Sequence, residues 1–92
     1  MYDEVVVKEF NIFWRDKNDK NVYDVLNGEA DVSSQVSLYS NRASSFPQEY
    51  PKGNFSLLLK DLKVTDSGRY TCFIPEVNIL RQVDLTVRAR GM

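Results

Sequence analysis

Histidine is missing from this 92-residue chain, and cysteine occurs once, as Cys72. Without an imidazole, the chain has no histidine general base, no Ser-His-Asp triad and no histidine metal ligand. A single thiol also excludes a zinc cluster and any disulfide within the chain. Carboxylates remain available, but the thirteen Asp and Glu residues show no clustering along the sequence. We therefore expect a protein that is not an enzyme and that uses no metal or cofactor.

The chain also has no excess of basic residues, since it contains twelve Lys and Arg residues and thirteen Asp and Glu residues. Nucleic acids and anionic membranes select basic patches, so neither is an expected partner. No apolar run approaches the ~18 residues that a membrane span requires. The first residues, Met1 to Glu4, do not have the basic and apolar regions of a signal peptide. If the domain is secreted, its signal peptide and anchor lie outside these 92 residues.

The length and composition fit one small globular domain over residues 1–92, with 42% hydrophobic and 27% charged residues. Short stretches of alternating apolar and polar residues recur between turns such as Asn27-Gly28, and no helix is expected. The stretches with strand character are residues 5–15, 22–26, 55–60, 69–74 and 79–88, with shorter candidates at 36–39 and 41–46. This spacing predicts an all-β antiparallel sandwich or barrel.

The sharpest motif is Asp-Ser-Gly-Arg-Tyr-Thr-Cys at residues 66–72. With Asp66, Gly68, Tyr70 and Cys72 it resembles the D-x-G-x-Y-x-C signature of immunoglobulin V-set domains. In that family the tyrosine two residues before the second cysteine forms the tyrosine corner, and Tyr70 matches it. Tyr70 and Cys72 also share one strand face, which we expect to point inward.

Two further stretches resemble the same family. Trp14 resembles the tryptophan of strand C that packs on the inter-sheet disulfide, and residues 52–62 resemble strand E and the turn that follows it. The resemblance implies an immunoglobulin-like V-type sandwich that begins at strand C. Strands A and B and the first cysteine would lie about a dozen residues before Trp14, where this chain has Met1, Tyr2 and Asp3.

This N-terminal truncation leaves two alternatives. Residues 5–7, three valines, could replace part of the missing sheet, or chains could pair as a homodimer through the surface left open. The missing bridge would cost about 2–4 kcal/mol. Cys72 also has two alternatives. It is either a buried, unreactive thiol that faces Trp14, or one half of an intermolecular disulfide.

Local matches narrow the resemblance within the V-set family. Antigen receptors of this family have glycines at the start of the last strand, whereas residues 78–83 of this chain contain none. Sialic-acid-binding lectins of this fold have an arginine just after the corner tyrosine, and residues 71–74 of this chain contain none. Residues 14–15, 22–28, 52–56 and 71–73 resemble the butyrophilin, myelin-oligodendrocyte-glycoprotein and T-cell co-stimulatory ligand group. That resemblance implies an extracellular recognition domain of a cell-surface protein, whose partner is another cell-surface protein, including members of the immunoglobulin superfamily. A homophilic cell-adhesion domain is the alternative.

The resemblance also implies that the sheet of strands C, C′, F and G binds the partner. Alternation along those strands assigns the outward residues, and exposed aromatic and Arg side chains typically anchor interfaces. The alternative for Phe13 and Phe73 is that the two rings only stack and shield each other. The expected partner-binding residues are Phe13, Arg15, Tyr23, Phe73, Gln82 and Asp84, with Arg81 nearer the loop.

Two more predictions concern single residues. The resemblance implies that Arg42 pairs with Asp66, and the planar guanidinium suits a carboxylate. The alternative is an exposed Arg42 beside an Asp66 that caps its own backbone. Asn54-Phe55-Ser56 is the only N-glycosylation sequon, and Asn54 should point outward because Phe55 points inward.

Overall fold

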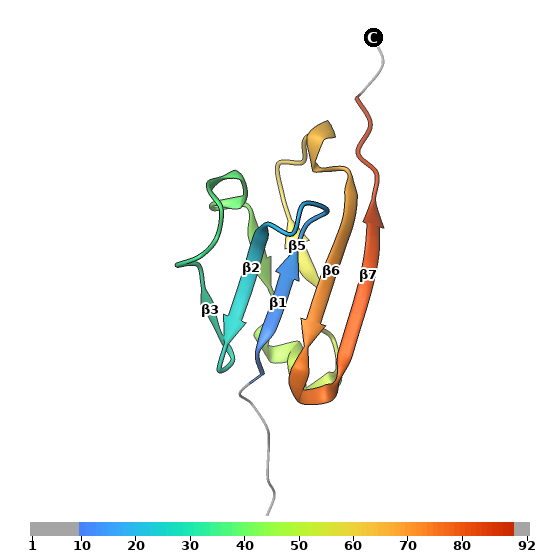
Figure 1. The fold of residues 1–92 in the computed structure, drawn as a ribbon. Helices are drawn as coiled ribbons and strands as arrows, with labels where there is room; N and C mark the ends of the chain where they lie inside the picture. The colour runs from blue at the N-terminus through green and yellow to red at the C-terminus, as the bar shows by residue number, and fades with distance from the viewer. Residues whose placement is uncertain (1–9, 90–92) are drawn as a thin grey trace, which may run out of the picture.

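Seven strands form within residues 10–89, the part of the chain that this computed structural model describes (Figure 1). The strands are β1 (Ile12–Arg15), β2 (Asn21–Leu26), β3 (Glu29–Asp31), β4 (Ala43–Ser45), β5 (Leu57–Leu59), β6 (Gly68–Ile74) and β7 (Ile79–Leu85). Four short 3₁₀ helices connect them: η1 (Ser37–Tyr39), η2 (Pro47–Lys52), η3 (Val64–Asp66) and η4 (Pro75–Val77). The expected strand at residues 36–39 is therefore wrong, because that segment closes into the turn of η1.

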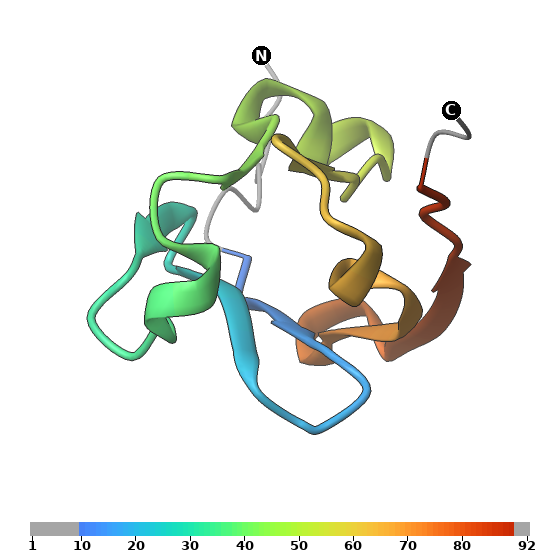
Figure 2. The same ribbon diagram turned by 90° about the horizontal axis from the view of Figure 1, so that it is seen from above.

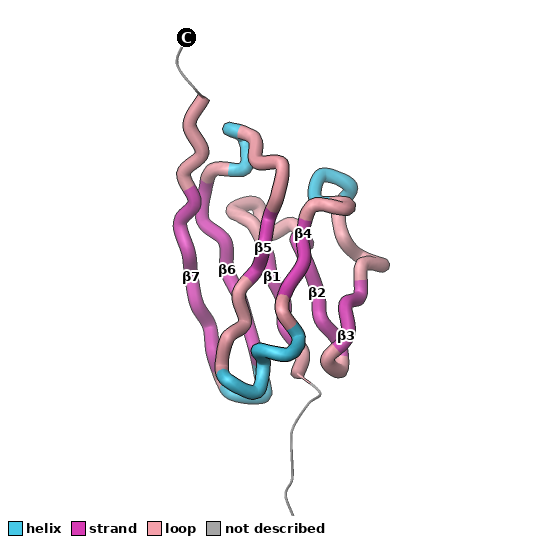
Figure 3. Tube along the Cα trace, turned by 180° about the vertical axis from the view of Figure 1, so that it is seen from behind, coloured by secondary structure: helices cyan, strands magenta, loops and turns pink. Residues whose placement is uncertain are grey.

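The strands form two antiparallel sheets that face each other (Figures 2 and 3). The larger sheet has the order β3-β2-β1-β6-β7, and the smaller sheet pairs β4 with β5. Sequential strands form hairpins, whereas β1 and β6, far apart in the sequence, meet at the centre of the larger sheet. The expectation of an all-β antiparallel sandwich is confirmed.

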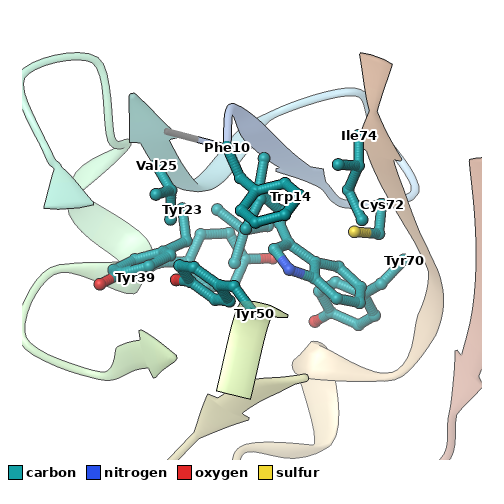
Figure 4. Packing of buried hydrophobic residues seen from close by; sticks show 11 residues of the cluster. Phe10, Trp14, Tyr23, Val25, Tyr39, Tyr50, Tyr70, Cys72 and Ile74 are labelled. Atoms are coloured by element: carbon teal, nitrogen blue, oxygen red, sulfur yellow. The ribbon is translucent and has the colours of Figure 1, made fainter. Parts of the chain in front are cut away.

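The core lies between the two sheets and is rich in aromatic side chains (Figure 4). The Phe10 ring lies 5.3 Å from the Phe55 ring and 6.1 Å from the Tyr50 ring, both in edge-to-face geometry. Large aromatic rings contribute much of the buried apolar area of a small domain. This cluster therefore joins the start of β1 to the layer that contains η2 and β5. The buried apolar residues are Phe10, Ile12, Trp14, Val22, Tyr23, Val25, Tyr39, Tyr50, Tyr70, Cys72 and Ile74.

A β-bulge between β1 and β2 changes which side chains of β2 point inward. Trp14 pairs with Tyr23 and Arg15 pairs with Asn21, so Val22 is an extra residue in β2. Because residues that pair across strands share a face, Tyr23 points into the core beside Trp14 and is only 7% exposed. The prediction that Tyr23 lies on the partner face is therefore wrong. Asp24, opposite Phe13, takes the outward position.

An open groove separates β5 from β7, because neither strand has a second neighbour among residues 10–89. Its wider part has a volume of about 270 Å³, and a smaller part of about 160 Å³ reaches Trp14 and Cys72. Val83 on β7 faces this groove and is 51% exposed. No strand precedes β1 in the described part of the chain, and residues 5–7, the three valines, lie outside it. The wider part is lined by Leu57, Leu58, Leu59, Leu62, Tyr70, Val83 and Leu85.

Candidate functional site

The residues of the sequence signature meet at one end of the sandwich. Arg42 donates a hydrogen bond through Nη2 to Asp66 Oδ2, and both side chains are buried. The backbone N–H of Lys63 donates to the same Asp66 oxygen at 2.7 Å. The Tyr70 hydroxyl donates to the Asp66 backbone oxygen at 2.6 Å, which is the geometry of a tyrosine corner. The expected Arg42–Asp66 pair and the tyrosine corner are both present.

Gly68 is needed at the start of β6 because its backbone adopts φ +140°. A Cβ at this position would lie 2.6 Å from Cδ of Lys17. The Lys17 ammonium donates to the Ser67 carbonyl at 2.8 Å, so the lysine stem covers this turn. The glycine of the signature therefore allows the β1–β2 turn to close over the start of β6.

Cys72 points into the core opposite Trp14, as expected, and it is a free thiol that is only 3% exposed (Figure 4). Burial raises the pKa of the thiol to about 11, and the nearby Arg81 lowers it only slightly. The indole Nε1 of Trp14 is buried and has no hydrogen-bond partner within residues 10–89. Both side chains lie at the bottom of the smaller part of the groove.

The outer face of the larger sheet carries a row of apolar side chains. Phe13 on β1 pairs with Phe73 on β6, and Phe73 pairs with Leu80 on β7. The two phenyl rings stack with centroids 6.4 Å apart, as the shielding alternative expects. Stacking does not cover the row, however, because Phe73 remains 42% exposed and Leu80 66% exposed. We name this row, Phe13–Phe73–Leu80, the apolar row.

Sequence reasoning missed Leu80, although a signal was present. Leu80 has the same parity in β7 as Gln82 and Asp84, which alternation assigns to the outer face. Arg81, in contrast, pairs with Cys72 and lines the groove between the sheets. The prediction that Arg81 belongs to the partner face is therefore wrong, because adjacent residues of a strand point to opposite faces.

Charged side chains on the outer face are paired with one another. Arg15 Nη1 donates to Asp24 Oδ1 at 2.7 Å, and its guanidinium carbon lies 5.7 Å from the centre of the Phe13 ring. Arg69 Nε donates to Asp84 Oδ1 at 2.8 Å, and this hydrogen bond holds the pKa of the Asp84 carboxyl below its ordinary value. The Arg15–Asp24 pair therefore flanks the apolar row at its Phe13 end, and the Arg69–Asp84 pair lies farther from the β6–β7 turn, beyond Gln82 and its partner Thr71 on β6.

Within residues 10–89, no three His, Cys, Asp or Glu side chains are placed to hold a metal ion. The helices of that same range are too short and too polar to cross a membrane. What the described outer face offers is an exposed apolar row near the β6–β7 turn with polar and charged side chains beyond it, a combination that protein-binding surfaces also have.

Comparisons with known proteins agree with this fold, although no family model matches the chain. The chain is 39% identical over 67 residues to the CD276 antigen homolog of Xenopus laevis, which covers 73% of this chain and 22% of that protein. It is 36% identical over 63 residues to programmed cell death 1 ligand 1 of Mus musculus, covering 68% of this chain and 21% of that protein. The matched region thus spans about a fifth of the length of these curated relatives.

A solved structure extends the agreement to three dimensions. The crystal structure of the human B7-H4 IgV-like domain aligns with a TM-score of 0.75 at 24% sequence identity, over 92% of this chain and 75% of that chain. Together with the signature and the sheet order, this likeness shows the fold of an immunoglobulin V-set domain. Among V-set domains, the chain resembles the T-cell co-stimulatory ligand group, to which its sequence relatives point.

Proposed function

We propose that this chain is a non-catalytic recognition domain of a cell-surface protein and that it binds a protein partner through the outer face of β2, β1, β6 and β7. The apolar row is the observation that supports this proposal most directly. One relative, programmed cell death 1 ligand 1 of Mus musculus, is named as a ligand of another protein. We extend that ligand role to this domain, whose partner we propose to be another cell-surface protein of the immunoglobulin superfamily.

Burial of the apolar row would supply the binding energy. Each Phe or Leu side chain that a partner covers completely contributes about 1.5–3 kcal/mol. Phe73 and Leu80 have most to gain because they are the exposed members of the row. The Arg15–Asp24 and Arg69–Asp84 pairs would then form the polar edge of the interface, where charges set orientation and association rate more than affinity.

The location and extent of the domain belong to the same proposal. We propose that residues 1–92 form one V-set-like domain, beginning at strand C, and that this domain is extracellular. Asn54, in the sequon, is exposed at the end of η2 and before β5. It precedes β5 of the smaller sheet and lines the smaller part of the groove, so it does not belong to the outer face of the larger sheet.

A binding experiment with T cells tests the proposal, because the resemblance is to T-cell co-stimulatory ligands. The 92-residue chain is joined into tetramers and bound to activated T lymphocytes. We expect Phe73→Ser and Leu80→Ser to weaken binding at least about tenfold, which equals 1.4 kcal/mol. Leu58→Ser is the matched control, since Leu58 is an exposed leucine on the other sheet. Unchanged binding by folded Phe73→Ser and Leu80→Ser would place the site elsewhere.

Self-association is the second candidate, and the open groove favours it. A second copy would cover Val83 and the leucines of β5 and would place an acceptor near Trp14 Nε1. Analytical ultracentrifugation separates the alternatives. A homodimer through the groove is weakened by Val83→Lys but not by Gln82→Lys, its outward-facing neighbour. A homophilic contact of the adhesion type, through the outer face, is weakened by Phe73→Ser instead. A monomer at all concentrations excludes both.

A further inference from the structure

Three separate segments meet below the apolar row and are joined by two side chains, Asn11 and Glu76. Asn11 immediately precedes β1, and Glu76 lies in η4, the turn between β6 and β7. The backbone N–H of Asn11 donates to Glu76 Oε1 at 3.1 Å, and the Asn11 side-chain amide donates to Glu76 Oε2. Asn11 Oδ1 in turn accepts from the backbone N–H of Asn27 at 3.0 Å, in the turn between β2 and β3.

The β6–β7 turn has few other contacts that could fix it. The Asn78 N–H donates to the Pro75 carbonyl at 3.1 Å across this turn, and Asn78 has a left-handed backbone with φ +53°. Val77 is 45% exposed, so packing contributes little to the order of the turn. A carboxylate that accepts two hydrogen bonds makes stronger bonds than neutral acceptors do. Glu76 therefore adds a link from this turn to the residue before β1, beyond the Ile74–Ile79 pair that ends the β6–β7 ladder.

The order of this turn affects the apolar row directly. Phe73 and Leu80 pair on either side of the turn, with Ile74 and Ile79 between them and η4. Glu76 ties the same turn to Asn11, two residues before Phe13 in the chain. A single hydrogen-bonded link thus connects the strand ends that carry all three members of the row.

We propose that Glu76 and Asn11 are positioning residues, which order the β6–β7 turn in the free domain and so set Leu80 beside Phe73 before a partner binds. This inference rests on the proposed function, because it concerns the same binding face. A surface that is ordered in advance binds more tightly, since binding no longer has to supply the ordering entropy. Neither residue needs to touch the partner for this effect.

Two variants of Glu76 and one control test the inference. Glu76→Ala removes both acceptors of Asn11, and Glu76→Gln keeps one oxygen while adding a donor that faces the Asn11 amide. Glu29→Ala is the matched control, because Glu29 is an exposed acid of the β2–β3 hairpin whose side chain makes no hydrogen bond within residues 10–89. It removes the same charge without removing the link.

The first measurement is amide hydrogen exchange in the free 92-residue protein, which requires no partner. We expect Glu76→Ala to accelerate exchange of the Asn11 N–H at least about tenfold. This N–H then has lost its acceptor, so no hydrogen bond has to break before it exchanges. Glu76→Gln should give a smaller acceleration, and Glu29→Ala should give none. Unchanged exchange at Asn11 in Glu76→Ala would overturn the inference, whatever the binding result.

The second measurement is binding of the same tetramers to activated T lymphocytes. We expect Glu76→Ala and Asn11→Ala to weaken binding about three- to tenfold, the range that corresponds to the ordering cost of one or two side chains. If exchange at Asn11 accelerates but binding stays at the level of Glu29→Ala, while Phe73→Ser abolishes it, the positioning role is wrong and the proposed function stands. If Phe73→Ser also leaves binding unchanged, the proposed function fails, and exchange at Asn11 still decides whether Glu76 orders the turn.

Discussion

Arg42 and Asp66 form a buried ion pair that joins the two sheets at one end of the sandwich. Arg42 immediately precedes β4 in the smaller sheet, and Asp66 ends η3, just before β6 of the larger sheet. The guanidinium also donates to the carbonyl of Leu38 at 2.8 Å and to the carbonyl of Lys60 at 3.2 Å. Arg42 therefore connects four segments, and its charge is balanced by one carboxylate.

Replacing Arg42 by Met should strongly destabilise the domain, because it leaves the buried carboxylate of Asp66 without a counter-ion. Loss of one partner of a buried pair typically costs about 3–5 kcal/mol. Urea unfolding followed by circular dichroism measures the change as a lower midpoint. Arg69→Met is the control: it breaks the Arg69–Asp84 pair, whose side chains are 57% and 67% exposed, and should change stability little. Equal effects of the two substitutions would contradict a major contribution of the buried pair to the stability of the domain.

Tyr70→Phe should lower the free energy of unfolding by about 1–2 kcal/mol. The substitution removes only the hydroxyl, which donates to the Asp66 carbonyl at 2.6 Å, and leaves the buried ring in place. The control is Tyr23→Phe, since the Tyr23 hydroxyl makes no hydrogen bond to residues 10–89 although its ring is buried equally well. If both variants unfold at the urea midpoint of the parent, the tyrosine corner contributes nothing measurable.

The thiol of Cys72 should react slowly with alkylating reagents at neutral pH and much faster after unfolding. Its pKa rises from an ordinary value of 9.0 to about 11 because burial disfavours the thiolate. Rates of iodoacetamide modification in buffer and in urea measure the difference. A covalent dimer on non-reducing electrophoresis would show instead that Cys72 is open to an intermolecular disulfide.

The same pKa difference predicts a dependence of stability on pH. Between pH 9 and about 11 the unfolded chain loses the thiol proton first, so the folded state binds more protons than the unfolded state. The contribution of Cys72 is therefore complete below pH 9 and is lost as the pH rises towards 11. Cys72→Ala lacks this dependence, so the stability difference between parent and variant should shift over that range in favour of Cys72→Ala. A constant difference would contradict the raised pKa.

Asn54 should carry an N-linked glycan when the protein is made in a eukaryotic secretory host. Asn54 is exposed, and its Oδ1 accepts hydrogen bonds from the N–H of Ser56 at 3.1 Å and the hydroxyl of Ser56 at 2.6 Å. Intact-mass spectrometry should show the added mass in the parent and its loss in Asn54→Gln and in Ser56→Ala. Asn18→Gln, outside any sequon, should keep the added mass. An unmodified Asn54 in the secreted parent would remove one support for the extracellular assignment.

The features that the sequence predicts well depend on strict alternation or on a dense local motif. Residues of β6 alternate without interruption, so Tyr70, Cys72 and Phe73 take the faces that their parity assigns. The Arg42–Asp66 pair follows from the family resemblance, and the structure contains it. In both cases the relevant information lies within one strand or in one contact that the family resemblance implies.

The errors arise where an alternation pattern is broken or where a second strand decides the outcome. Tyr23 points inward because it pairs with Trp14, and the bulge next to that pair adds Val22 to β2; the β2 sequence marks neither feature. Leu80 becomes important only because it pairs with Phe73, which depends on the register between β6 and β7. The groove depends on which strands lie beside β5 and β7, a property of the whole fold.

The sheet order has a consequence for the speed of folding. The β1–β2 and β6–β7 hairpins contain only local contacts, and isolated hairpins form within about 1–10 μs. The β1–β6 pairing, in contrast, brings together residues as distant in the sequence as Phe13 and Phe73. Closing so long a loop costs entropy before any contact repays it, which slows proteins rich in non-local pairs. We therefore expect the meeting of the two hairpins along β1 and β6 to limit the rate of folding, and substitutions along β1 and β6 to slow folding more than they speed unfolding.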